Sequence, residues 1–90
     1  MMTLVLKIKN KNVPWQGYYL PAVSGFQIGC RSWETVYKNI QKLIKKAETT
    51  DFIMDWYIEL YDGKYETYKN NELLETYDKS RLKDMEYKIA

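Results

Sequence analysis

The segment from Ser32 to Glu48 constrains the fold most, because its apolar residues recur with the period of an α-helix. Spacings of three and four residues predict one apolar stripe on a helix with 3.6 residues per turn. Ser32 is a favourable N-cap, since its hydroxyl can accept an unpaired backbone N–H of the first turn. Burial contributes roughly 1.5–3 kcal/mol per large side chain, so the chain must supply a facing apolar surface. The stripe comprises Trp33, Val36, Tyr37, Ile40, Leu43, Ile44 and Ala47.

The remaining chain predicts strands. Residues 3–9 and 52–61 alternate apolar and polar side chains, which indicates two strands with one buried face each. Two shorter strands are predicted at residues 17–23 and 26–31, joined by a turn at Ser24–Gly25 into an antiparallel hairpin that leads into the helix. Pro21 cannot donate a ladder hydrogen bond, so the first of these is predicted to be an edge strand or to carry a bulge.

A second hairpin is predicted at Asp62–Gly63, with a return strand over residues 64–69. Its register stays open between a two-residue loop and a longer loop with a bulge at Gly63. Residues 72–77 are compatible with a short strand or a helical turn, and residues 85–89 with a final strand. The competing interpretation is one helix from residue 72 to residue 87.

These elements predict a single α+β domain over residues 1–90. We expect a mostly antiparallel sheet of about five strands in the order β-β-β-α-β-β, with one amphipathic helix packed on one face. A helix is roughly 10–12 Å wide and strands lie about 4.8 Å apart. A five-stranded sheet is therefore about twice as wide as one helix. The face away from the helix is predicted to lack a cover, unless the C-terminal segment is itself helical and folds over it.

Two candidate binding sets follow from this arrangement. Clustered rings on an uncovered face indicate an interaction site, although tyrosine is also a common strand former whose rings can scatter singly. Lysines on the exposed helix face can contact phosphate or an acidic partner, although a solvated helix face is the ordinary explanation for them. The predicted partner- or nucleotide-binding residues are Tyr18, Tyr19, Tyr57, Tyr61 and Tyr68. The predicted phosphate or acidic-partner contacts are Lys38, Lys42, Lys45 and Lys46.

Several kinds of chemistry are excluded by composition. The chain has no His, which excludes His-dependent triads and His-metal sites. The one Cys, Cys30, excludes an internal disulfide and is predicted to be a core side chain, since no base is available to activate it. Asp55, Glu59, Asp62 and Glu66 are expected to be solvated and match no calcium loop. We therefore expect no enzyme activity, no cofactor and no metal.

The N-terminal residues lack the features of a signal peptide, and no window approaches the roughly 18 apolar residues of a membrane span. We expect a soluble cytoplasmic protein without a membrane partner. The net charge of +2 does not by itself indicate nucleic acid as the partner.

Residues 16–44, with Gly17, Tyr18 and Tyr19 in a strand followed by a short hairpin and an amphipathic helix, resemble the β-β-β-α order of HicB-type antitoxins. The family's acidic pair before Gly-Tyr-Tyr and its Pro-Gly-Cys turn are absent from this chain. The resemblance implies an antitoxin-like module.

The leading functional expectation is a small non-catalytic protein that binds a host or partner protein through the aromatic sheet face, or self-associates as a homodimer. Small size and surplus aromatic residues are typical of phage- or mobile-element-encoded inhibitors of a host component. The alternative is a nucleotide or single-stranded nucleic-acid binding protein, including a nucleotide-sequestering dimer, in which rings stack bases at about 1–3 kcal/mol each.

Overall fold

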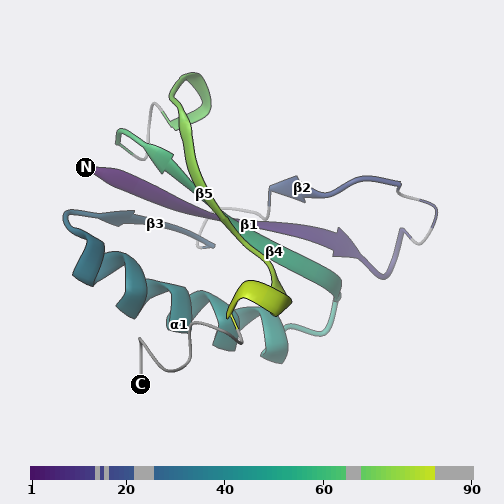
Figure 1. Ribbon diagram of the computed structural model, residues 1–90. Coiled ribbons are helices and arrows are strands. Elements are labelled where there is room, and N and C mark those ends of the chain that lie inside the picture. The colour runs from purple at the N-terminus through teal and green to yellow at the C-terminus, as the bar shows by residue number, and fades with distance from the viewer. Residues whose placement is uncertain (14, 16, 22–25, 65–67, 83–90) are drawn as a thin grey trace.

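The computed structural model describes residues 1–13, 15, 17–21, 26–64 and 68–82, which form an α+β fold as predicted. A five-stranded antiparallel sheet packs against one main helix (Figure 1). The chain order is β1 (Met2–Asn10), β2 (Leu20–Pro21), β3 (Gln27–Cys30), α1 (Trp33–Thr49), β4 (Ile53–Asp62), the 3₁₀ helix η1 (Tyr68–Asn70) and β5 (Leu73–Tyr77). Among the described residues, no helix is both long and apolar enough to cross a membrane.

β1 lies in the middle of the sheet and organises its neighbours. It pairs with β4 along one edge, from Met2 opposite Asp62 to Asn10 opposite Ile53. Along its other edge it pairs first with β3 and then with β2. Both partners are antiparallel to β1, so β2 and β3 run in the same direction. The predicted hairpin between them is therefore wrong, because the two strands occupy successive stretches of one edge; its turn at residues 24–25 lies outside the described residues.

The prediction of an edge strand at Pro21 is confirmed, because β2 pairs on one side only within the sheet order. Among the described residues the strand consists of Leu20 and Pro21, so it begins later than predicted, and residues 22–23 of the prediction lie outside the described residues. Proline has no backbone N–H to donate, and an edge position tolerates this loss.

The core lies between α1 and the facing side of the sheet. Ser32 caps the helix by accepting the backbone N–H of Thr35 at 3.3 Å, as predicted. The buried stripe of α1 is narrower than the predicted stripe. Trp33 and Tyr37, at the edge of the predicted stripe, remain 46% and 36% exposed. The side chains that close the core are Leu4, Leu6, Val36, Ile40, Leu43, Ala47, Ile58 and Leu60.

The second predicted hairpin is also wrong. Asp62 continues β4, and the strand that pairs with β4 next is β5. Of the predicted return strand, residues 68 and 69 lie in η1, and residues 65–67 lie outside the described residues. Gly63 adopts φ +96° and donates its N–H to the Met1 carbonyl at 2.8 Å, while Asp62 donates to the Glu72 carbonyl at 2.9 Å. These bonds hold Gly63 beside β1, so the chain leaves the sheet there and returns ten residues later along the sequence, at Leu73.

Neither register considered for that hairpin is correct, because β4 pairs with β5. Leu60 lies opposite Glu75, and Glu59 lies opposite Thr76, so no carboxylate faces Glu59 across the ladder. The strand interpretation of residues 72–77 is confirmed, and the single helix from residue 72 to residue 87 is excluded. A helical turn over residues 79–82 follows, and Asp78 caps it by accepting the Arg81 N–H at 2.8 Å. The strand predicted at residues 85–89 lies outside the described residues.

Candidate functional site

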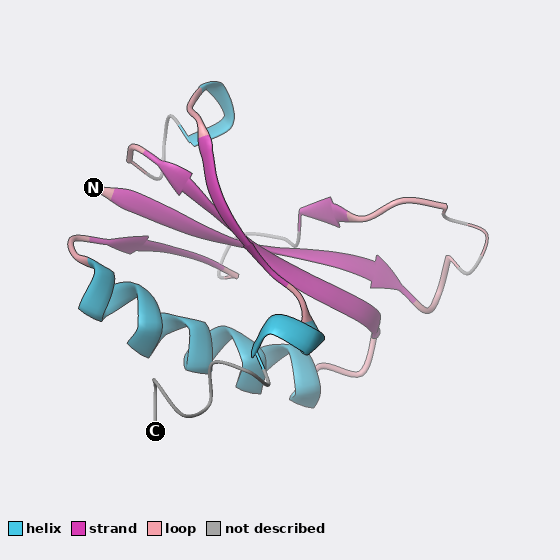
Figure 2. Ribbon diagram, viewed as in Figure 1, coloured by secondary structure: helices cyan, strands magenta, loops and turns pink. Residues whose placement is uncertain are grey.

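The sheet face away from α1 is partly covered by the chain itself. Thr3 and Val5 alternate with core residues of β1 and so point to this face, yet both are fully buried. Tyr68 of η1 is 5% exposed, packs 5.4 Å from the Tyr61 ring and accepts a hydrogen bond from Gln27 Nε2 at 3.0 Å. Figure 2 shows η1 and α1 on opposite sides of the strands. The prediction of a face without cover is therefore wrong at this end of the sheet.

The other end of the same face is open in the described part of the chain and holds the ring pair Tyr19–Tyr57. The two rings pack edge to face, with centroids 4.9 Å apart and planes at 80°. Lys9 Nζ lies 4.8 Å from the centroid of the Tyr19 ring. Tyr57 comes from β4, opposite Lys7 of β1. Two half-buried rings are thus fixed against each other outside the hydrophobic core.

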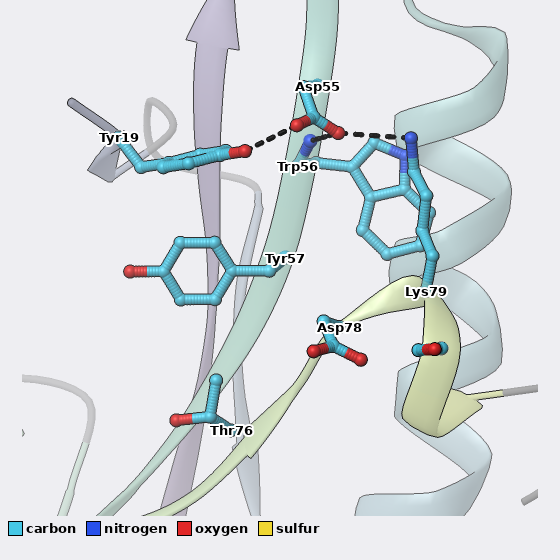
Figure 3. A pocket seen from close by; sticks show the side chains of 8 residues that line it. Tyr19, Asp55, Trp56, Tyr57, Thr76, Asp78 and Lys79 are labelled. Atoms are coloured by element: carbon cyan, nitrogen blue, oxygen red, sulfur yellow. Dashed lines mark hydrogen bonds and ion pairs between the residues drawn. The ribbon is translucent and has the colours of Figure 1, made fainter. Parts of the chain in front are cut away.

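Asp55 of β4 anchors this ring pair through three hydrogen bonds (Figure 3). One carboxylate oxygen accepts the Tyr19 hydroxyl. The other accepts the Trp56 backbone N–H at 2.9 Å and Lys79 Nζ at 3.0 Å. The bond from Tyr19, together with Lys79, lowers the pKa of Asp55 against the opposing effect of its burial. The same bond raises the pKa of Tyr19 to about 12, so a neutral phenol donates to an ionised carboxylate.

An open hollow adjoins the ring pair where β5 stops pairing with β4. β5 pairs with β4 only from Ile58 to Tyr61, whereas β1 pairs with β4 along its whole length. The helical turn capped by Asp78 carries the chain away from β4 at this point. The space left has a volume of about 590 Å³ and is open to solvent. We call it the hollow; its lining comprises Tyr19, Asp55, Trp56, Tyr57, Thr76, Asp78, Lys79 and Ser80.

Glu59 lies between the two ends of the face. The prediction that its carboxylate is solvated is wrong. It is 8% exposed, accepts the Tyr61 hydroxyl at 3.2 Å and forms an ion pair with Lys7 at 3.5 Å. Burial, followed by the charge of Glu59 and its hydrogen bond, raises the pKa of Tyr61 to about 12. Glu59 is buried because β4 is a central strand with neighbours on both sides.

The five predicted tyrosines divide into three groups in space. Tyr19 and Tyr57 form the half-buried ring pair beside the hollow, while Tyr61 and Tyr68 form a second pair at the covered end. Tyr18 is 64% exposed and precedes Tyr19 but does not line the hollow.

The four predicted lysines lie on α1, across the sheet from Tyr57. Lys38 lies 3.9 Å from Glu34 in an exposed ion pair, and Lys46 Nζ lies 5.4 Å from the Phe26 ring centroid. Lys42 and Lys45 are exposed on the same helix. The rings and the helix lysines therefore do not meet in one site.

Asp55, Thr76 and Lys79 were not among the predicted site residues. Asp55 and Lys79 are separated by 24 residues in sequence, and Asp55 and Tyr19 by 36. These side chains come together only in the folded sheet. Lys9 pairs with Asp55, and β5 ends its pairing with β4 beside them. Alternation along β4 places Asp55 on the face of Tyr57, and this was the one available signal.

The chemistry of Cys30 agrees with its predicted place in the core. The thiol is fully buried, accepts a hydrogen bond from Asn39 Nδ2 at 3.5 Å, and has its pKa raised by burial. A buried thiol with a raised pKa is a poor nucleophile. In the part of the chain that is described, no group of three or more Cys, Asp or Glu side chains could hold a metal ion.

Comparison of the chain with family models, curated proteins and solved structures found no significant match. The resemblance to HicB-type antitoxins thus depends on the pattern of residues 16–44 alone. The short hairpin in that pattern is absent from the fold, since β2 and β3 both pair with β1.

Proposed function

We propose that this chain is a small non-catalytic protein that binds a partner protein through the uncovered end of its sheet face. The observation that carries the proposal is the ring pair Tyr19–Tyr57, which is held outside the core by Asp55 and Lys9. Tyrosine has an apolar body, a polar tip and few rotatable bonds, so it loses little conformational entropy on binding. A pre-organised pair beside a hollow is the kind of anchor on which interfaces depend.

A protein partner is favoured over a nucleic acid by the surroundings of the rings. The hollow carries two carboxylates, Asp55 and Asp78, and one ammonium group, Lys79, which is already paired with Asp55, so its net charge does not favour phosphate. Lys9 Nζ lies 4.8 Å from the Tyr19 ring centroid, and the edge of Tyr57 packs against the face of Tyr19 (Figure 3), so little of the Tyr19 ring is free for a base to stack on. The lysines of α1 lie across the sheet from these rings, so they cannot hold a phosphate beside them. We propose further that the chain inhibits a host component by occupying its surface.

The experiment compares Tyr57→Ser with the control Trp33→Ser, which removes an exposed ring from α1 on the other side of the sheet. Each full chain is immobilised and exposed to an extract of the source cells, and bound proteins are identified by mass spectrometry. We expect Tyr57→Ser, and not Trp33→Ser, to abolish capture of a specific protein. Hydrogen exchange of the purified complex should show slower exchange at residues 55–57.

A captured protein that binds Tyr57→Ser as well as the wild type would contradict the proposal. Protection confined to α1 in the complex would contradict it as well. Circular dichroism of both variants checks that neither substitution unfolds the sheet.

A further inference from the structure

The segment that joins β1 to β2 exposes more aromatic surface than any other described part of the chain. We define the arm as residues 9–13, 15 and 17–20. Trp15 is 80% exposed, Tyr18 64% and Leu20 45%, and the first two values are the largest among the exposed large hydrophobic residues that are described. Figure 1 shows the ends of β1 and β2 extending beyond α1. Because monomeric proteins rarely expose contiguous apolar patches, a partner surface is expected to cover the arm.

The arm is cationic and the hollow is anionic. The first 33 residues of the chain contain no Asp or Glu, and all 12 acidic residues lie from Glu34 onward. The arm carries Lys9 and Lys11. The hollow carries two carboxylates, Asp55 and Asp78, and one ammonium group, Lys79, which is already paired with Asp55 at 3.0 Å. The two surfaces are therefore complementary in charge, and each presents aromatic rings.

The arm and the hollow are neighbours on one molecule. Tyr19 belongs to the arm and also forms one wall of the hollow, and Figure 3 shows its ring reaching from the β2 side toward Asp55, with Thr76 and Asp78 beyond Tyr57. A two-fold axis beside Tyr19 would bring the arm of each copy over the hollow of the other. Such an isologous contact is made twice and closes at a dimer.

We propose that the chain forms a symmetric dimer in which Trp15 and the arm of each copy occupy the hollow of the other. The inference rests on the proposed function, since it names a second copy as a protein bound at the uncovered sheet face. The hollow, at about 590 Å³, has the volume of sites that hold organic groups larger than an indole ring. The carboxylates of the hollow attract Lys11 of the arm, and the rings of Trp56 and Tyr57 supply apolar contact.

Sedimentation velocity over a range of protein concentrations tests the dimer. We expect a reversible monomer–dimer equilibrium that weakens between about 0.05 M and about 0.5 M NaCl, because salt screens exposed charges. Trp15→Ser should raise the dissociation constant at least about thirtyfold, the effect of truncating a hot-spot tryptophan. Trp33→Ser, the matched exposed tryptophan on α1, should leave it unchanged. A wild-type monomer at the highest soluble concentration would overturn the proposal, as would equal dimerisation of Trp15→Ser.

Mixing two defective variants tests the exchange itself. Trp15→Ser keeps an intact hollow, and Thr76→Arg keeps an intact arm but fills the hollow with a cationic side chain. Neither should dimerise alone, whereas an equimolar mixture should form heterodimers through one intact arm–hollow contact. A mixture that stays monomeric would overturn arm exchange.

The two proposals fail separately. A monomeric chain that still captures another protein through Tyr57 would overturn the dimer and leave the proposed function intact. A dimer that survives Tyr57→Ser and Thr76→Arg, with no other protein captured, would overturn both.

Discussion

Tyr68 provides the sharpest test of the fold, because its burial shows that η1, between β4 and β5, covers one end of this sheet face. Burying the ring contributes roughly 1.5–3 kcal/mol. Its hydrogen bond from Gln27, 3.0 Å long, contributes roughly 0.5–1.5 kcal/mol, and its packing on Tyr61 contributes a similar amount. These contributions overlap, and the surface connection can relax into the vacated space. We therefore expect Tyr68→Ala to lower the free energy of unfolding by about 3 kcal/mol.

Two further variants separate the contributions. Tyr68→Phe keeps the ring and loses the hydroxyl, so it should cost about 1 kcal/mol. Tyr57→Ala removes a half-buried ring from the uncovered end and should also cost about 1 kcal/mol. The loss expected for Tyr68→Ala is large against the 5–15 kcal/mol that stabilises a typical domain.

Urea unfolding, followed by the far-UV circular dichroism of the sheet and helix, measures all three variants. The midpoint should fall most for Tyr68→Ala and by a smaller, similar amount for Tyr68→Phe and Tyr57→Ala, while the slope with denaturant stays constant. If Tyr68→Ala lies within about 0.5 kcal/mol of the wild type, the connection does not cover the sheet. If Tyr57→Ala costs as much as Tyr68→Ala, the two ends of the face are equally buried and the candidate site loses its basis.

Three other predictions follow from single residues. Gly63→Ala should destabilise the fold by about 1–2 kcal/mol in the same urea assay, because φ +96° strains any L side chain and a Cβ there would collide with Asn71; unchanged stability would show that the connection relaxes freely. Burial raises the pKa of Tyr77 to about 12, above its usual value of 10, so the stability that its neutral phenol provides is complete below pH 10 and is lost as the pH rises to 12. That loss of stability is about 2–3 kcal/mol. If Tyr77→Phe loses the same stability over this pH range, other groups cause the loss. The Cys30 thiol, buried and with a raised pKa, should react with an aromatic disulfide reagent only as fast as the chain opens; rapid labelling of the native protein would contradict its place in the core.

The sequence alone determined the local elements of this protein. The helix follows from spacings of three and four residues and from the hydroxyl of Ser32, all within one segment. The strands β1 and β4 follow from alternation, which also assigned Leu4, Leu6, Ile58 and Leu60 to the core. These signals suffice because helix caps and periodic faces depend on residues a few positions apart.

The tertiary structure decided which strands pair and which tyrosines remain accessible. The residues of a strand do not specify which strand it will pair with, so β2 and β3 could align along β1 instead of pairing with each other. Gly63 binds the backbone at Met1, 62 residues away in sequence, and this contact moved the return strand to Leu73. The hydrogen bond from Gln27 to Tyr68 spans 41 residues and buries a ring that alternation had placed in solvent. Contacts over such separations depend on the register of the whole sheet, and so the hollow beside Asp55 exists only once β1, β4 and β5 have paired.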